Sequence, residues 1–349
     1  MLSSTSSSRV PATGGLPFAL FIALLAYAVS DRFLWSYPPW LRFCARYAPL
    51  YSAHDYPMRT AVRIGLLQPH ENEPPILLLG SSQVYEGLSC ARFRRRFPGR
   101  TCENLGIAVG SPMDMLFLLD LADQRAKKRV TVVAFLPSTL HQGPKPAFTD
   151  LTTLLLLVKG GALLHMSPRE WVSVVDGLLQ SSSETLRMSA SLQALWTFVG
   201  QDPWAALRHK LPPLQLREFL PRPLHELRKK MGRVLDPEAT PGRFTRANEL
   251  AIEEILSLEA HRGNRVVLVD CPTRDGYETT LTPEAVLHYR RLLDHLAVRP
   301  EVMLVRRDDL PQLGDEDFRD FVHMMPPGRD KTSVGLAEIL ARTEAASRP

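Results

Sequence analysis

The sequence predicts an α/β fold, a three-layer α/β/α sandwich in which helices cover both faces of a five-stranded parallel sheet. Three observations predict it. The 349-residue chain is 45% hydrophobic and 23% charged, so it can bury a core and is neither wholly disordered nor a multi-span membrane protein. Short runs that are apolar throughout recur along it, as in strands covered on both faces. Helical patterns separate these runs, and this alternation indicates a doubly wound sheet.

The elements follow one another in a regular order. The expected strands are Ile76–Leu79, a weaker run at Cys102–Ile107, and then Val130–Leu136, Arg265–Asp270 and Glu301–Val305. Helical patterns between and after them occupy residues 87–97, 112–126, 282–297 and 329–344.

Residues 146–260 interrupt this alternation. Their periodicity is helical, and many of the chain's 29 prolines lie there. We therefore expect a helical insertion over 146–260, which divides the α/β domain into a first part at 76–145 and a second part at 261–349.

The N-terminus carries a stretch, Leu16–Ser30, that is uncharged and mostly apolar. It is shorter than the roughly 20 residues of a typical membrane span, but an aromatic-rich group suited to a membrane interface follows it. We expect a signal anchor at 1–36, with an N-terminal transmembrane helix, and a proline-rich juxtamembrane connector at 37–75. A signal peptide cleaved near residues 26–28 and a buried soluble helix are the alternatives. Either of the first two interpretations exports the rest of the chain, to the periplasm or the extracellular side.

The net charge of +5 traces to one local cluster of arginines. Its members are Arg92, Arg94, Arg95, Arg96 and Arg100. Without them the balance is neutral, so the composition does not indicate a nucleic-acid partner.

Four cysteines are present. Cys90 and Cys102 are close enough in sequence to close a small loop with a disulfide, and buried thiols are the alternative. No Cys or His spacing indicates zinc, and we expect no metal or organic cofactor.

The first strand ends in Gly80-Ser81-Ser82-Gln83. A strand that runs through glycine into serines and then a helix places a hydroxyl at the carboxyl edge of the sheet, where open α/β folds have their sites. The alternative is that Ser81 or Ser82 only caps the helix.

A second polar group follows the last strand: Asp320-Phe321-Val322-His323. Nucleophilic serine chemistry needs a base beside the hydroxyl and an acid that orients the base. This pair lies between the last strand and the last helix, which places it at the same sheet edge as Ser82. Asp317 is the substitute candidate for Asp320.

These residues resemble the SGNH/GDSL hydrolase superfamily, whose fold is a flavodoxin-like sandwich. Gly80-Ser81-Ser82 matches the family's first block, with Ser81 in place of the usual Asp. The resemblance implies that Ser82 is the nucleophile, His323 the general base and Asp320 the orienting acid. It also implies that Gly80, Ser81 and the neighbouring Gln83 line the substrate or oxyanion site.

The family's two middle blocks are less complete. The second resembles the run from Asn104 to Gly110, where Gly106 or Gly110 would supply an oxyanion-hole N–H. The third block, a Gly-x-Asn after the third strand, is missing. Ser138, Thr139 or a backbone N–H would have to replace its donor, which is typically worth about 10²–10³ in rate.

The Gly-Ser-Ser run, the missing Asn and the expected anchor resemble one branch of this superfamily. It contains the membrane-anchored proteins that O-acylate cell-surface polymers, of the D-alanyl transfer and alginate O-acetylation type. The resemblance implies a serine O-acyltransferase or esterase acting on a carbohydrate or an acylated small molecule. A membrane-bound O-acyltransferase partner would supply the acyl group. The alternative is a non-catalytic scaffold that binds a glycan or such a partner, for which Ser82 and His323 would point apart.

Overall fold

A parallel five-stranded sheet forms the centre of the protein. The computed structural model describes residues 74–123, 125–181 and 242–346, together with isolated positions before residue 65. The strands are β1 (Ile76–Gly80), β2 (Cys102–Asn104), β3 (Val130–Phe135), β4 (Arg265–Asp270) and β5 (Val302–Val305). Their order in the sheet is β2-β1-β3-β4-β5, with every neighbouring pair parallel. This arrangement confirms the predicted α/β fold and has the flavodoxin-like strand order.

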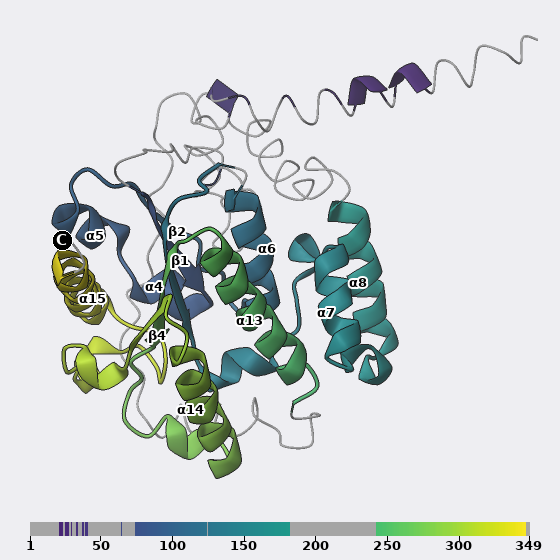
Figure 1. Cartoon of the computed structure of the whole chain (residues 1–349). Coiled ribbons are helices and arrows are strands. Elements are labelled where there is room, and N and C mark those ends of the chain that lie inside the picture. The colour runs from purple at the N-terminus through teal and green to yellow at the C-terminus, as the bar shows by residue number, and fades with distance from the viewer. Residues whose placement is uncertain are drawn as a thin grey trace, which may run out of the picture.

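Helices cover both faces of the sheet (Figure 1). On one face lie α4 (Ser82–Gly87), α5 (Cys90–Arg96) and α15 (Pro326–Ala346). On the other lie α6 (Pro112–Asp123), α13 (Thr245–His261) and α14 (Pro283–Ala297). Short 3-10 helices connect several of these elements: η2 (Pro137–His141), η5 (Glu278–Thr280), η6 (Arg307–Asp309) and η7 (Asp315–Asp317).

Strand β1 is apolar at nearly every position because each face of the sheet has its own core. In β1, Leu77 and Leu79 pack into the core under α6 and α13. Ile76 and Leu78 pack into the core under α5 and α15. Successive side chains of a strand point to opposite faces, so a strand covered on both sides needs apolar residues at every position.

The region expected to be an insertion contains two kinds of structure. Residues 146–181 form η3 (Pro146–Phe148), α7 (Leu151–Lys159), η4 (Ala162–His165) and α8 (Pro168–Ser181), and Figure 1 shows α7 and α8 outside the layer of α6 and α13. Helix α13 differs from them, since its Ala247, Ile252 and Ile255 are fully buried in the core beneath the sheet. This helix precedes β4 and belongs to the layer that covers the sheet.

The helix expected at 87–97 begins earlier and is divided into α4 and α5. The residues between them are Leu88 and Ser89, whose backbone groups bond elsewhere. The carbonyl of Leu88 accepts from Asn104 Nδ2 at 2.9 Å, and the N–H of Ser89 donates to Ser333 Oγ at 2.8 Å. These partners outside the helix account for the break.

No helix in the described part of the chain is long and apolar enough to cross a bilayer. Most of the expected signal anchor at 1–36 and of the connector at 37–75 lies outside the described residues.

Candidate active site

Three side chains from two distant parts of the chain form a continuous hydrogen-bonded row. Ser82 Oγ lies 2.8 Å from His323 Nε2. On the other side of the imidazole, Nδ1 lies 2.8 and 2.9 Å from the two carboxylate oxygens of Asp320. This is the arrangement of a nucleophile, a base and an orienting acid, and its first contact lies within the reach of about 2.6–3.2 Å required of a general base.

The first member of the row is positioned by the end of β1. Ser82 is the first residue of α4, two residues beyond Gly80. A Cβ atom at Gly80 would lie 2.2 Å from Val84 Cγ2 and 2.5 Å from the carbonyl oxygen of Ala134. Glycine is therefore needed for the chain to turn this closely from β1 into α4. The turn lies beside β3, where the strand order reverses and open α/β sheets place their sites.

The other two members lie on a loop between β5 and α15. Phe318 and Met324 close this loop by an antiparallel bridge, and the N–H of Arg319 donates to the carbonyl of His323 at 2.8 Å. Inside it, Asp320 Oδ1 accepts the backbone N–H groups of Val322 at 3.0 Å and His323 at 2.8 Å. The carboxylate is thus held by the loop that presents the histidine.

The imidazole of His323 and two backbone N–H groups stabilise the negative charge of Asp320. Burial alone would raise the pKa of this carboxyl, but the hydrogen bond and charge of His323, together with the two backbone N–H groups, lower it from 3.8 to about 2. The group is therefore an anion throughout the neutral range. It can hold Nδ1 of His323 in the protonated tautomer and stabilise an imidazolium.

The alternative role of the serines, capping the helix with a side-chain hydrogen bond, does not match the structure. Ser81 occupies the N-cap position of α4 but makes no side-chain capping hydrogen bond. Its hydroxyl bonds instead to Gln83 Oε1. Ser81, Ser82 and Gln83 are buried, whereas the side chains of His323 and Asp320 are 21% and 25% exposed.

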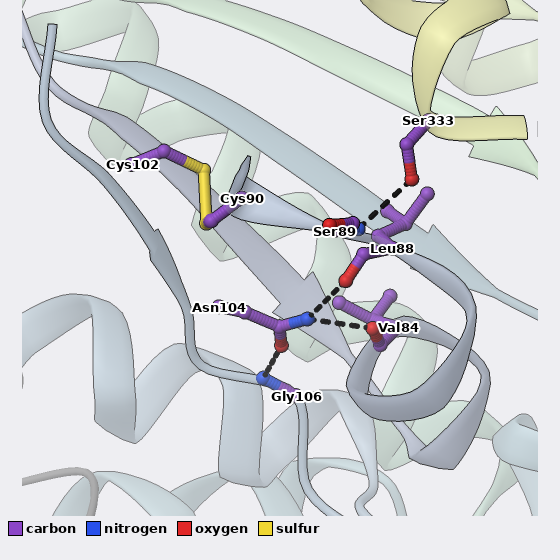
Figure 2. Close-up of a disulfide and its surroundings, with 8 residues drawn as sticks. All are labelled: Val84, Leu88, Ser89, Cys90, Cys102, Asn104, Gly106 and Ser333. Atoms are coloured by element: carbon purple, nitrogen blue, oxygen red, sulfur yellow. Dashed lines mark hydrogen bonds between the residues drawn. A yellow bond between two sulfur atoms is a disulfide. The ribbon is translucent and has the colours of Figure 1, made fainter. Parts of the chain in front are cut away.

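The helix that carries Ser82 is fastened to β2 (Figure 2). Asn104 Nδ2 donates to the carbonyls of Val84 at 2.8 Å and Leu88 at 2.9 Å, and its Oδ1 accepts from the N–H of Gly106 at 2.9 Å. The expected disulfide between Cys90 and Cys102 is present nearby, with Cα atoms 5.3 Å apart. It joins the start of α5 to the start of β2. Asn104 therefore acts on the backbone of α4 rather than on a substrate.

The glycines expected to supply the oxyanion hole have other partners. The N–H of Gly106 donates to Asn104 Oδ1, and that of Gly110 donates to the carbonyl of Ile107 at 3.0 Å. Both N–H groups therefore have acceptors within their own loop in this structure, and the oxyanion role expected of these glycines stays a prediction. The N–H of Ser82 is in a different situation, because the first residue of a helix has no intrahelical acceptor.

Ser138 lies on η2, directly after β3. Its Oγ accepts a hydrogen bond of 3.0 Å from the hydroxyl of Tyr277. Tyr277 is 1% exposed, and burial is the main cause that raises its phenol pKa. Tyr277 is not among the residues predicted from the sequence, and no local pattern could indicate it, because 139 positions separate it from Ser138.

Arg319 is a second residue that sequence analysis missed. Its Nη2 lies 2.9 Å from Glu86 Oε2 on α4, and its Nε lies 3.8 Å from Asp320 Oδ2. It links the helix of the nucleophile to the loop of the acid. Asp317, the substitute candidate, is instead bound to Lys331 and to the N–H of Gly314.

The described residues contain no group of His, Cys, Asp and Glu side chains that could hold a metal ion. The row of Ser82, His323 and Asp320 can by itself activate a hydroxyl for attack on a carbonyl.

Comparison with known proteins adds little. No protein-family model and no curated protein matches the chain. Among solved structures it is similar to a protein provisionally described as a platelet activating factor from Streptococcus pneumoniae, at 12% identity and a TM-score of 0.36, over 92% of this chain and 99% of that one. It is also similar to a provisionally described acylhydrolase from Bacteroides fragilis, at 12% identity and a TM-score of 0.40, over 80% and 93% of the two chains. Likeness at this level carries no argument about function, which therefore rests on the residues of the site.

Proposed function

We propose that this protein is an extracytoplasmic serine O-acyltransferase or esterase that acts on a cell-surface carbohydrate. One observation carries the proposal: the unbroken row from Ser82 Oγ through the imidazole of His323 to Asp320. A serine that only caps a helix needs neither partner.

The reaction runs in two halves. Ser82 Oγ attacks the carbonyl carbon of the acyl donor while His323 Nε2 takes the hydroxyl proton, and a tetrahedral oxyanion forms. The intermediate collapses to an ester on Ser82 when His323 returns the proton to the leaving alcohol. A second hydroxyl, of water or of a sugar, then repeats the sequence and leaves with the acyl group. Asp320 stabilises the imidazolium in both halves.

The proposal also covers the cellular compartment of the protein and its attachment to the membrane. The disulfide between Cys90 and Cys102 supports an oxidising compartment, because such bonds are rare in the reducing cytosol. The apolar stretch near the N-terminus would anchor the chain in the membrane, with its site facing the periplasm or the extracellular side. A membrane-bound O-acyltransferase partner would deliver the acyl group to Ser82.

The scaffold alternative has one observation in its favour. The N–H groups of Gly106 and Gly110 are engaged inside their own loop, so two expected oxyanion donors have other acceptors in this arrangement. The 2.8 Å contact between Ser82 and His323 favours the enzyme, since a scaffold has no need to align them.

Hydrolysis of p-nitrophenyl acetate by the full-length protein in detergent, with and without an oligosaccharide acceptor, tests the proposal. The wild type is expected to release nitrophenol and to form acyl-Ser82, and a transferase will also give acylated sugar. Ser82→Ala should abolish all three products. Ser257→Ala, which removes an exposed hydroxyl on α13 that bonds to the carbonyl of Glu253 and to Arg299, is the matched control. Equal rates in Ser82→Ala and wild type would contradict the proposal.

A further inference from the structure

Most of the large apolar side chains that are exposed between residues 74 and 346 lie on one helical hairpin. The hairpin is Leu151–Ser181 and contains α7, η4 and α8. Apolar residues scattered singly over a surface are ordinary, whereas a contiguous group marks a contact surface. The other described ones in this range are Val109, Leu287, Val298 and Val334, at most two of which share an element. Those on the hairpin are Leu151, Leu155, Val158, Leu164, Trp171, Val172, Val175 and Leu179.

The hairpin is attached to the rest of the protein by its opposite side. A Cβ atom at Gly160, where α7 ends, would lie 2.7 Å from the backbone nitrogen of Ala247 on α13. A Cβ atom at Gly177 on α8 would lie 2.6 Å from Cβ of Thr149, just before α7. These close approaches hold both helices in place, and Figure 1 shows them at the outside of the molecule. The exposed faces therefore point away from the body of the protein.

The exposed side chains follow the helical repeat. On α7, Leu151, Leu155 and Val158 are spaced at i, i+4 and i+7, and on α8 Trp171 and Val175 are four positions apart. An amphipathic helix on a protein surface ordinarily turns its apolar stripe toward the core and polar residues toward water. Here an apolar stripe of each helix is turned outward, so this face is suited to a partner or to an apolar phase.

The charged groups of the hairpin are unevenly placed. Lys159 and Arg169 lie on either side of the connection between α7 and α8, both are exposed, and neither forms an ion pair with another described residue. The acid at this end, Glu170, is neutralised by Arg243, whose Nη1 lies 2.8 Å from Glu170 Oε2. The exposed Asp176 lies about two turns further along α8. The connecting end of the hairpin therefore carries a net positive charge.

This composition favours lipid over protein as the partner. Leu164, on the connection itself, is 88% exposed. Leucine and valine are under-represented among the residues that carry the binding energy of protein interfaces, whereas acyl chains accept any aliphatic side chain. Tryptophan, here Trp171, is enriched where a membrane meets water. Cations next to an outward apolar face are attracted to anionic headgroups.

We propose that the outward face of the hairpin lies against an anionic lipid bilayer. Leu164 and Trp171 would enter the headgroup region, with Lys159 and Arg169 beside the lipid phosphates. The contact is peripheral and does not span the membrane. It goes beyond the proposed function, because it involves neither the Ser82 row nor the apolar stretch near the N-terminus, and it restrains the orientation of the domain on the bilayer.

Fluorescence of single labels on the full-length protein tests the inference. A Cys44→Ser background removes one cysteine, and the other three are disulfide-bonded or buried. Leu164→Cys or Val172→Cys then carries the fluorophore NBD, and the protein is reconstituted into vesicles of phosphatidylcholine and phosphatidylglycerol. Both labels are expected to emit at shorter wavelength than in water and to be quenched by lipids with nitroxide-bearing acyl chains.

Val298→Cys is the matched control. Val298 is 80% exposed at the C-cap of α14, outside the hairpin, so its label should keep an aqueous emission and resist quenching. Lipid charge supplies a second readout. Changing Lys159 and Arg169 to glutamine should shift the equilibrium toward the undocked hairpin about 5-fold for each charge. Quenching at Leu164 should fall accordingly, and also in vesicles of phosphatidylcholine alone.

Three results would overturn the inference. Labels at Leu164 and Val172 could be as exposed to water as the label at Val298. They could be shielded from water yet unquenched by lipid, which would mean that protein covers this face. Quenching that responds neither to lipid charge nor to the loss of Lys159 and Arg169 would exclude anionic lipid as the partner. Each result leaves the proposed function standing, because ester hydrolysis and acyl-Ser82 formation by the same protein test that separately.

Discussion

Replacing Asn104 with alanine removes three hydrogen bonds. Two of them link β2 to the backbone of the nucleophile's helix at Val84 and Leu88, and the third is accepted from the N–H of Gly106. Asn104 is 7% exposed, so water cannot easily replace the lost amide. At about 1 kcal/mol for each bond, the free energy of unfolding should fall by about 3 kcal/mol. The carbonyls of Val84 and Leu88 then lose their partner, and α4 is free to shift. A displacement of about 1 Å at Ser82 can cost about 100-fold in kcat.

Urea unfolding and ester hydrolysis measure the two effects separately. Ser333→Ala is the control in the same region. It removes the bond that Ser333 Oγ accepts from the N–H of Ser89 and the one it donates to the carbonyl of Arg329, and should cost about 2 kcal/mol. Asn104→Ala is expected to lose more stability than Ser333→Ala and also to lose activity when fully folded. An Asn104→Ala variant with stability within 0.5 kcal/mol of wild type, on the order of ordinary surface changes, would refute the reasoning.

Three further predictions concern the acid and the disulfide. Asp320→Asn should lower kcat about 10⁴-fold, because the amide favours the wrong tautomer of His323, and unchanged ester hydrolysis would refute this. The pKa of Asp320 is lowered from 3.8 to about 2, so its contribution of about 2 kcal/mol is present above pH 4 and is lost as the pH falls toward about 2. Urea unfolding over that range should show a smaller decline in Asp320→Asn, and parallel curves would count against it. Replacing Cys90 and Cys102 together by serine should lower the free energy of unfolding by about 3 kcal/mol, and an unchanged urea midpoint would contradict this.

Most of the sheet could be predicted from the sequence because β1, β3, β4 and β5 are largely apolar and can be covered on two faces. The expected runs at 130–136 and 265–270 correspond closely to β3 and β4. The weaker run at 102–107 yields a strand of only three residues, Cys102–Asn104. Beyond it, the N–H groups of Leu105 and Ile107 still bond to Leu78 and Gly80, so the chain continues beside β1 as an irregular extension.

The helices were less predictable where tertiary contacts decide their ends. The break between α4 and α5 depends on Asn104 and Ser333, and the second of these lies 244 positions from its partner. Helix α13 falls within the proline-rich region and has polar residues on much of its surface. Its place beneath the sheet depends on packing against α6, and this contact cannot be predicted from the local order of polar and apolar residues.

The candidate site, too, could be predicted from the sequence only in part. Ser82, Asp320 and His323 were found because strand ends of a parallel sheet meet at one edge, so positions in the sequence translate into proximity. The partners of Gly106, Gly110 and the hydroxyl of Ser138 depend on the directions of individual N–H and O–H groups. No residue pattern records those directions.

The central claim is that Ser82 is activated by His323, and labelling with a fluorophosphonate probe tests it most directly. Mass spectrometry of the labelled full-length protein would locate the adduct, with Ser82→Ala and His323→Ala as comparisons. The account predicts an adduct on Ser82 that is absent from the first variant and strongly reduced in the second, since an unactivated serine reacts poorly with such probes. A folded wild-type protein that carries no adduct on Ser82, or an equal yield in His323→Ala, would contradict it.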